Sequence, residues 1–247
     1  MTYKAEAPSK KSDQLGHRPK RFWREAVPAQ VAEGFEIHLD GRAVKTPQGH
    51  VLRFPTLAVA GQVAGEWAAV GEYVGYEDMP LTRLGFAAVD RMDTLVAETV
   101  GEVLRYTETD LVCYPSEYPA ALIEREDAAW LPLIDWANEA LGLEFRQNRT
   151  LIHKPQPAET AARIQALVEG ATAYERAGLM SAIPLFGSVV LALAVWKGRI
   201  AGEAAFEASR VGEDFQSETW GRDEEAAQRA ASMRAQARSL DVWFRNL

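Results

Sequence analysis

FEIHLDGRAVKTPQGHVLRF, residues 35–54, decides the fold class of the amino-terminal part of this 247-residue chain. Its first six residues alternate between apolar and polar, as in a strand with one buried face. The pair Asp40-Gly41 is a hairpin turn signal, and Pro47-Gln48-Gly49 marks a second turn before another apolar run. Because no helix of crossover length separates these strands, the stretch predicts an antiparallel meander.

A helical period follows the meander. Thr56, which comes after Pro55, is the expected N-cap. Apolar residues then recur every three or four positions in two stretches, first at Leu57, Ala60, Ala64, Trp67, Val70 and Val74, then at Val89, Met92, Val96, Val100 and Val103. GYEDMPLTRLGF, residues 75–86, is predicted to be a turn-rich connection between these two helices. DLVCY, residues 110–114, favours a short strand that returns to the amino-terminal sheet.

From about Pro119 onward the pattern is helical. One helix is expected up to Leu141, where Gly142 stops it. The proline-bounded stretch FRQNRTLIHKPQP, residues 145–157, predicts a strand or an extended connection. Further helices are expected at 158–170, 172–178, 183–197, 202–219 and 223–244.

These patterns predict an α+β fold in three parts. A flexible basic arm covers residues 1–20, an α+β domain with an antiparallel sheet covers residues 21–118, and an orthogonal multi-helix bundle covers residues 119–247. Hydrophobic content of 47% with 25% charged residues is ordinary for a globular protein. The single cysteine, Cys113, excludes an intramolecular disulfide and indicates a reducing compartment.

Charge is distributed unevenly along the chain. Residues 1–24 hold seven of the 27 basic residues and two of the 35 acidic ones, so this arm carries +5 and the remainder −13. The acidic body argues against nucleic-acid binding. The apolar stretch at 179–196 has about the length of a membrane span, but Pro184, Gly187 and Ser188 interrupt it. A core helix without stable membrane insertion is therefore expected.

Signatures of catalysis and cofactor binding are missing. The sequence contains no Walker loop, dinucleotide fingerprint or nucleophile elbow, so no cofactor is predicted. The four histidines are scattered without ligand spacing, and no metal is predicted. Cys113 lies among apolar neighbours and is expected to be a buried, inert thiol.

One acidic stretch, EDFQSETWGRDEEA at 213–226, stands out. Asp223 suits a helix N-cap, and Glu224 and Glu225 would then stabilise the dipole of the last helix. Structure does not account in this way for Glu213, Asp214 and Glu218. Two hypotheses remain for these acids. They form a docking surface, or the carboxylates of residues 213–225 serve an acid–base or metal-assisted hydrolase.

Several segments, taken in order, resemble one known family: LDGRAVKTP (39–47), EW (66–67), MPLTRL (79–84), TDLVCY (109–114), GSVVLALAV (187–195) and EDFQSETWG (213–221). The family is that of the assembly chaperones of the F-type ATP synthase that act on its alpha subunit. The resemblance extends from about Phe22 to about Glu225. It implies a β-containing domain followed by a helical bundle, with no catalysis and no cofactor.

The resemblance also implies the partner and the site. Such chaperones hold the unassembled alpha subunit until the alpha–beta hexamer forms, and they shield an apolar interface from wrong contacts. On this basis five residues are predicted to contact the client: Glu213, Asp214, Gln216, Glu218 and Trp220. For Trp220, core packing between consecutive helices is the alternative. The expected location is the bacterial cytoplasm, or the mitochondrial matrix for a eukaryotic source.

Overall fold

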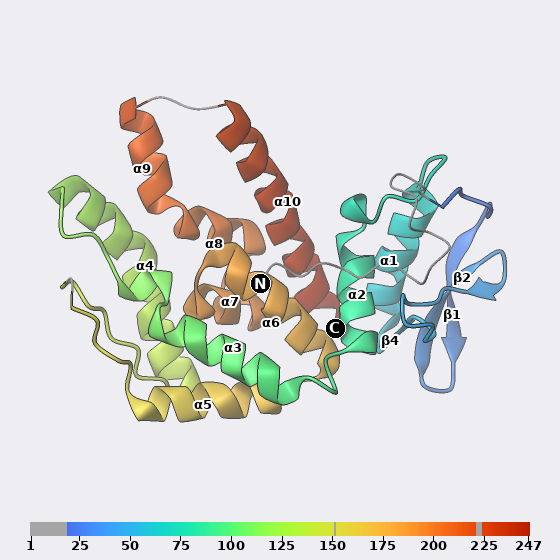
Figure 1. The fold of residues 1–247 in the computed structure, drawn as a ribbon, viewed down its shortest axis with the longest axis horizontal. Helices are drawn as coiled ribbons and strands as arrows, with labels where there is room; N and C mark the ends of the chain where they lie inside the picture. Colours follow the sequence, from blue (N-terminus) through green and yellow to red (C-terminus); the bar gives the residue numbers. More distant parts are fainter. Residues whose placement is uncertain (1–18, 151, 221–223) are drawn as a thin grey trace. The chain divides into compact units, whose positions relative to one another are not determined.

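A computed structural model describes residues 19–150, 152–220 and 224–247 of the chain. It contains two compact units, of which unit 1 comprises Met1–Thr94 with Asn246–Leu247 and unit 2 comprises Leu95–Arg245. Figure 1 shows strands in unit 1 and helices in both units. The predicted α+β class, with a small antiparallel sheet followed by many helices, is confirmed.

The sheet of unit 1 is built around one central strand. The strands are β1 (Ala26–Val31), β2 (Gly34–Leu39), β3 (Arg42–Ala43) and β4 (Arg53–Phe54). Strand β2 pairs antiparallel with β1 on one side and with β3 and β4 on the other. The predicted turn between β2 and β3 is confirmed, because Asp40 and Gly41 both have positive φ angles, of 47° and 80°.

Among its described residues, unit 1 also holds two α-helices and a 3₁₀ turn: α1 (Leu57–Ala69), η1 (Tyr76–Asp78) and α2 (Pro80–Asp90). Helix α1 packs on β1 and β2. The side chain of Thr56 accepts the N–H of Val59 at 3.2 Å, which confirms the predicted N-cap. The prediction that residues 75–86 are a connection is wrong for their second half. Proline suits the first position of a helix because its missing N–H is not needed there, and α2 begins at Pro80.

Unit 2 holds a 3₁₀ turn and eight α-helices within the described residues: α3 (Val96–Glu108), η2 (Leu111–Cys113), α4 (Ala120–Leu141), α5 (Ala158–Glu169), α6 (Ala173–Phe186), α7 (Val189–Trp196), α8 (Gly202–Ser209), α9 (Val211–Trp220) and α10 (Glu224–Asn246). Figure 1 shows α7 among its neighbours, and it contacts α3, α4, α6 and α8. All seven residues from Val189 to Val195 are buried. Among the described residues, no helix has both the length and the apolar character that crossing a membrane requires.

The prediction that residues 110–114 return to the amino-terminal sheet is wrong. Leu111–Cys113 is a 3₁₀ turn of unit 2, where the N–H of Leu111 donates to the carbonyl of Gly187 at 3.0 Å. Unit 2 also includes α3, which packs against α5 and α6. The compact units therefore divide after Thr94, whereas the sequence pattern suggested a domain boundary at residue 118.

The two helices expected at 172–178 and 183–197 are α6 and α7, but their boundary lies elsewhere. Gly187 ends α6 in the left-handed conformation, with φ of 64°, and Ser188 caps α7. Gly178, the expected stop, lies inside α6. A Cβ there would come within 2.5 Å of the ring of Phe244, so this glycine permits close packing of α6 and α10.

The single helix expected at 202–219 is two helices, α8 and α9. The indole N–H of Trp130 on α4 donates to the carbonyl of Ala208 at 2.8 Å. In a continuous helix that carbonyl would accept the N–H of Gly212. The chain turns at Arg210 instead, and α9 leaves α8 to pack against α4.

Candidate functional site

The predicted client-contact residues lie on α9. The side chains of Glu213, Asp214, Gln216 and Glu218 are all exposed. Trp220 is the last residue of α9, and its side chain lies outside the described part of the structure. Helix α9 thus brings four of the five predicted residues to one exposed surface of unit 2, here called the α9 surface.

Arginines of the same chain neutralise much of the α9 surface. Arg210 pairs with Glu213 and lies 3.8 Å from Asp214. On α4, Arg125 donates to Glu218 at 2.9 Å, and its guanidinium lies 5.1 Å from the centre of the Phe215 ring. Exposed ion pairs of this kind contribute only about 0–1 kcal/mol each. Since they are weak, a basic group of a partner can replace them.

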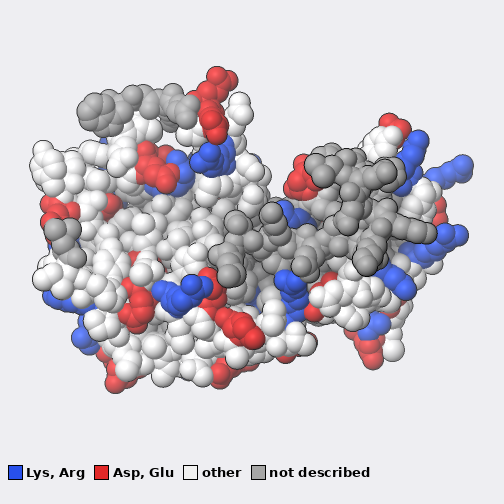
Figure 2. Space-filling view, viewed as in Figure 1, with Lys and Arg blue, Asp and Glu red and all other residues white. Residues whose placement is uncertain are grey.

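Two arginines of α10 pair with acids of the neighbouring helix α8. Arg234 and Arg238 of α10 both pair with Glu203, at 2.8 and 2.7 Å, and Arg234 also pairs with Glu207. Hydrogen bonds from Arg238 and Arg234 lower the pKa of Glu203 to about 2. Figure 2 shows acidic and basic side chains side by side at this end of unit 2. These pairs link the surfaces of α8 and α10.

Metal chemistry finds no support in the described residues, which bring together no group of three His, Cys, Asp or Glu side chains suited to hold an ion. The predicted N-cap Asp223 lies outside the described residues. Cys113 is buried as predicted, and burial raises the pKa of its thiol. A thiol in this state is a poor nucleophile.

Two carboxylates that the sequence patterns did not single out, the half-buried Glu66 and the buried Asp110, hold helix ends in place. In unit 1, Glu66 accepts the backbone N–H groups of Leu81 and Thr82 at 2.8 and 2.7 Å, at the start of α2. In unit 2, Asp110 accepts the N–H groups of Val189 and Val190 at the start of α7. The hydrogen bonds of Glu66 join the motif EW (66–67) to MPLTRL (79–84), and those of Asp110 join TDLVCY (109–114) to GSVVLALAV (187–195). The motifs around residues 66, 80, 110 and 188 therefore contribute contacts that specify the fold.

Burial raises the pKa of Glu66 and that of Asp110 above the ordinary values of these groups, to about 6 for Asp110. Backbone N–H groups act against this effect at both sites, because they stabilise the charged form. A signal for Asp110 was present in the sequence, since it is a lone acid next to the apolar run Leu111–Cys113. Its partner 79 residues later was not predictable from spacing.

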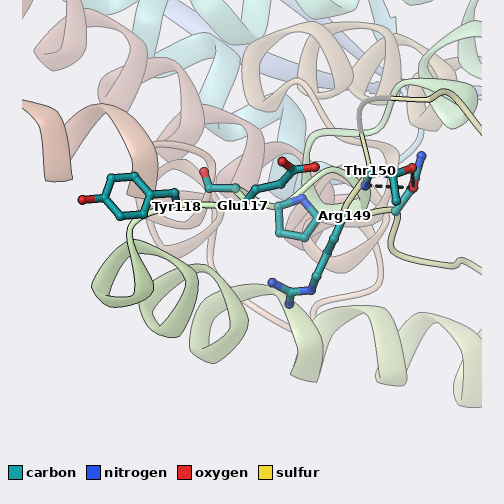
Figure 3. A pocket seen from close by; sticks show the side chains of 7 residues that line it. Glu117, Tyr118, Arg149 and Thr150 are labelled. Carbon is teal, nitrogen blue, oxygen red and sulfur yellow. Dashed lines mark hydrogen bonds between the residues drawn. The ribbon is translucent and has the colours of Figure 1, made fainter.

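A pocket of about 400 Å³ lies in unit 2 between two connections that are far apart in the sequence. Its lining is Pro115, Ser116, Glu117, Tyr118, Asn148, Arg149 and Thr150. Figure 3 shows Tyr118 and Thr150 at opposite ends, with Arg149 extending toward α4. Sequence patterns did not predict this pocket, because its walls come from two separate loops.

Comparisons with known proteins give a consistent result. The family model described as ATP12 chaperone protein matches residues 20–138. The mitochondrial protein atp12 of Schizosaccharomyces pombe is 24% identical over 219 residues, which cover 84% of this chain and 75% of that protein. The crystal structure of Atp12 from Paracoccus denitrificans is 35% identical, with a TM-score of 0.85, and covers 92% of this chain and 97% of its own.

A further solved structure, that of a putative chaperone from Agrobacterium tumefaciens, is 34% identical with a TM-score of 0.84. It covers 92% of this chain and 85% of its own. The similarity to these two bacterial proteins therefore includes both units, whereas the family model ends within α4.

Proposed function

The chain belongs to the ATP12 chaperone family, and from this premise we propose that it binds the unassembled alpha subunit of the F-type ATP synthase. In doing so it promotes assembly of the alpha–beta hexamer. Membership confirms two predictions from the sequence, a chaperone of this family and a non-catalytic role. The observation that carries the proposal is 35% identity across 97% of the Paracoccus denitrificans Atp12 chain.

The client-contact residues of this proposal are Glu213, Asp214, Gln216, Glu218 and Trp220. The four described side chains are exposed on one helix, and their ion pairs stay at the surface of unit 2. A chaperone must release its client to the next subunit, so its contacts should be weaker than those of the final complex. A surface of replaceable ion pairs meets this requirement, because charged groups set orientation and partner choice more than affinity.

The sources of the relatives support a proposed place of action. One is mitochondrial and two come from bacteria. We place the protein in the cytoplasm of a bacterial source, or in the mitochondrial matrix of a eukaryotic one.

Co-expression tests the proposed function. The alpha subunit of the same organism is produced alone and together with this protein, and its yield after centrifugation is measured, followed by affinity capture of the complex. We expect a higher yield and co-purification in the second case. The beta subunit, treated in the same way, is the control. Capture of beta and not alpha, or of neither, would refute the proposal.

The hydrolase hypothesis gains nothing from the site geometry. Arg125 binds Glu218, and Arg210 pairs with Glu213, so both acids lie among charged groups at the surface and not in an apolar cleft. Glu213, Asp214 and Glu218 lie on an exposed helix, so water is not excluded from a substrate bound there, as it is in a closed active site.

A further inference from the structure

Two large apolar side chains of unit 2 are far more exposed than is usual, and both belong to the loops that form one pocket. Tyr118 is 84% exposed and Ile152 is 75% exposed. Tyr118 lines the pocket. The carbonyl of Ile152 accepts hydrogen bonds from the side chains of two other lining residues, Asn148 at 2.7 Å and Thr150 at 3.2 Å. Exposed apolar groups on the loops around a hollow indicate an interaction site.

The walls of this pocket are held by buried polar groups. On one side Glu126, which is 3% exposed, accepts both the backbone N–H and the hydroxyl of Ser116, at 2.6 and 2.8 Å. On the other side the N–H of Asn148 donates to the carbonyl of Cys113 at 2.7 Å. Since both loops are fixed to the bundle, the pocket is formed before any partner arrives, which lowers the entropic cost of binding.

Charge around the pocket is negative. Asp127 on α4 neutralises Arg149, and Glu218 neutralises Arg125. Glu117 lines the pocket and Glu124 lies one turn into α4. Within the described part of the chain, no ion pair involves either of these two acids. A partner with a basic residue beside its apolar one therefore complements this rim.

The pocket is also continuous with the α9 surface through α4. Glu126, which holds Ser116 at the pocket wall, lies 4.0 Å from the position of a Cβ on Gly212 of α9. The residue before it on α4, Arg125, contacts Glu218 and Phe215 of α9. The pocket and the α9 surface thus both contact the first turns of α4, and no other helix among the described residues lies between them.

We propose that this pocket is a second contact site for the alpha subunit, which inserts an apolar side chain from an extended segment between Tyr118 and Ile152 and places a neighbouring lysine or arginine against Glu117. This inference rests on the proposed function and extends its surface from α9 to the other side of α4. Aromatic and apolar anchors in a preformed pocket carry most of the binding energy in many complexes, while charged groups at the rim set the partner choice.

Affinity of the full-length protein for the alpha subunit tests the site. Ile152→Ser and Tyr118→Ser each remove one exposed anchor, Thr150→Trp fills the pocket, and Glu117→Lys reverses the charge of the rim. We expect each to weaken binding about tenfold, as for interface anchors. Phe22→Ser is the matched control, because Phe22 is 66% exposed in unit 1. Thermal unfolding of every variant identifies any that fail to fold.

The outcomes separate the two proposals. If the wild-type protein captures the alpha subunit and the folded pocket variants bind it as tightly, the pocket site is overturned and the proposed function stands. Equal losses from Ile152→Ser and Phe22→Ser would also overturn it, since binding would then follow exposed apolar area in general. If the wild-type protein fails to capture the alpha subunit, both proposals fall. A loss confined to the pocket variants supports the site.

Discussion

The carboxylate of Asp110 accepts the backbone N–H of Val189 at 2.7 Å, across 79 positions of sequence. It also accepts the N–H groups of Val190 and Val112, at 3.0 and 3.2 Å. Asp110 has no exposed surface, and α7, which it caps, is the most buried helix of unit 2. The bundle is therefore assembled around a helix whose first N–H groups are satisfied by a distant side chain.

Replacing Asp110 with alanine should destabilise the protein by about 3 kcal/mol, because three buried N–H groups lose their acceptor. Chemical denaturation gives the free energy of unfolding. Asp135→Ala, at an exposed position of α4, is the control and should change it by less than about 0.5 kcal/mol. Similar values for the two variants would contradict the role of Asp110.

The same carboxylate should make stability depend on pH. The ordinary pKa of Asp is 3.8, and burial raises that of Asp110 to about 6 in the folded protein. The folded state thus binds this proton more tightly. The resulting stabilisation is complete below pH 3.8 and disappears as the pH rises through about 6.

Asp110→Asn cannot titrate at this position. The free energy of unfolding of the wild type should therefore fall relative to that of Asp110→Asn as the pH rises through this range. Glu66 has a raised pKa in both proteins, so its effect cancels in the difference. Denaturation curves measured at several pH values give the comparison, and a constant difference would show that Asp110 keeps its ordinary pKa.

Two glycines in helices should respond to alanine in opposite directions. A Cβ on Gly202 of α8 would collide with the carbonyl oxygen of Ala237 on α10, whereas a Cβ on Gly101 of α3 would meet open space. Gly202→Ala should cost about 1–3 kcal/mol through overpacking. Gly101→Ala should stabilise by about 0.5–1 kcal/mol, because alanine favours a helix. Thermal unfolding checks both, and a destabilised Gly101→Ala would show that α3 packs differently.

Neutralising α9 should affect client binding and not folding. Glu213→Gln, Asp214→Asn and Glu218→Gln, combined in one protein, remove exposed carboxylates whose ion pairs contribute little to stability. We expect an unfolding midpoint within about 3 °C of wild type and at least about tenfold weaker capture of the alpha subunit.

The control for the α9 variant is Glu139→Gln with Glu159→Gln, at exposed positions on α4 and α5. It should leave capture unchanged. Equal loss from both variants would indicate a general effect of net charge. A sharp fall in the unfolding midpoint of the α9 variant would instead make its acids structural.

Pro28 should protect the outer edge of the sheet. The carbonyl of Ile37, which lies opposite Pro28, accepts the N–H of Val44, the residue that follows β3. The nitrogen of Pro28 therefore faces away from β2. Within the described residues no strand pairs with that edge. Pro28→Val restores a donor there and should increase self-association.

Sedimentation velocity over a range of concentrations measures this association. Ala29→Val is the matched control, because its N–H already points toward β2. Identical sedimentation of the wild type and Pro28→Val would show that proline has no protective role at this edge.

Local patterns predicted the elements whose determinants are local. The Asp40-Gly41 turn, the Thr56 cap and the Gly142 stop all have the predicted geometry. The reason is that a positive φ or a first-turn N–H is satisfied by residues within three positions. The ordered motifs likewise identified the family, since they include the buried acids and apolar runs on which the fold depends.

Two of the errors arose where a distant residue controls the local structure. Residues 110–114 do not join the sheet, because their backbone forms hydrogen bonds with Gly187 and Asn148. Helix α8 ends early, because the indole N–H of Trp130 donates to the carbonyl of Ala208. The periodicity of apolar residues along the sequence does not predict hydrogen bonds between distant residues.

The sequence by itself thus determined the α+β class, the local turns and caps, and the exposed acids of α9. Only the tertiary structure decided where the units divide, which acids are paired, and that two loops enclose a pocket. The physical reason is that these features depend on contacts between residues far apart in the chain, whose partners no local pattern specifies.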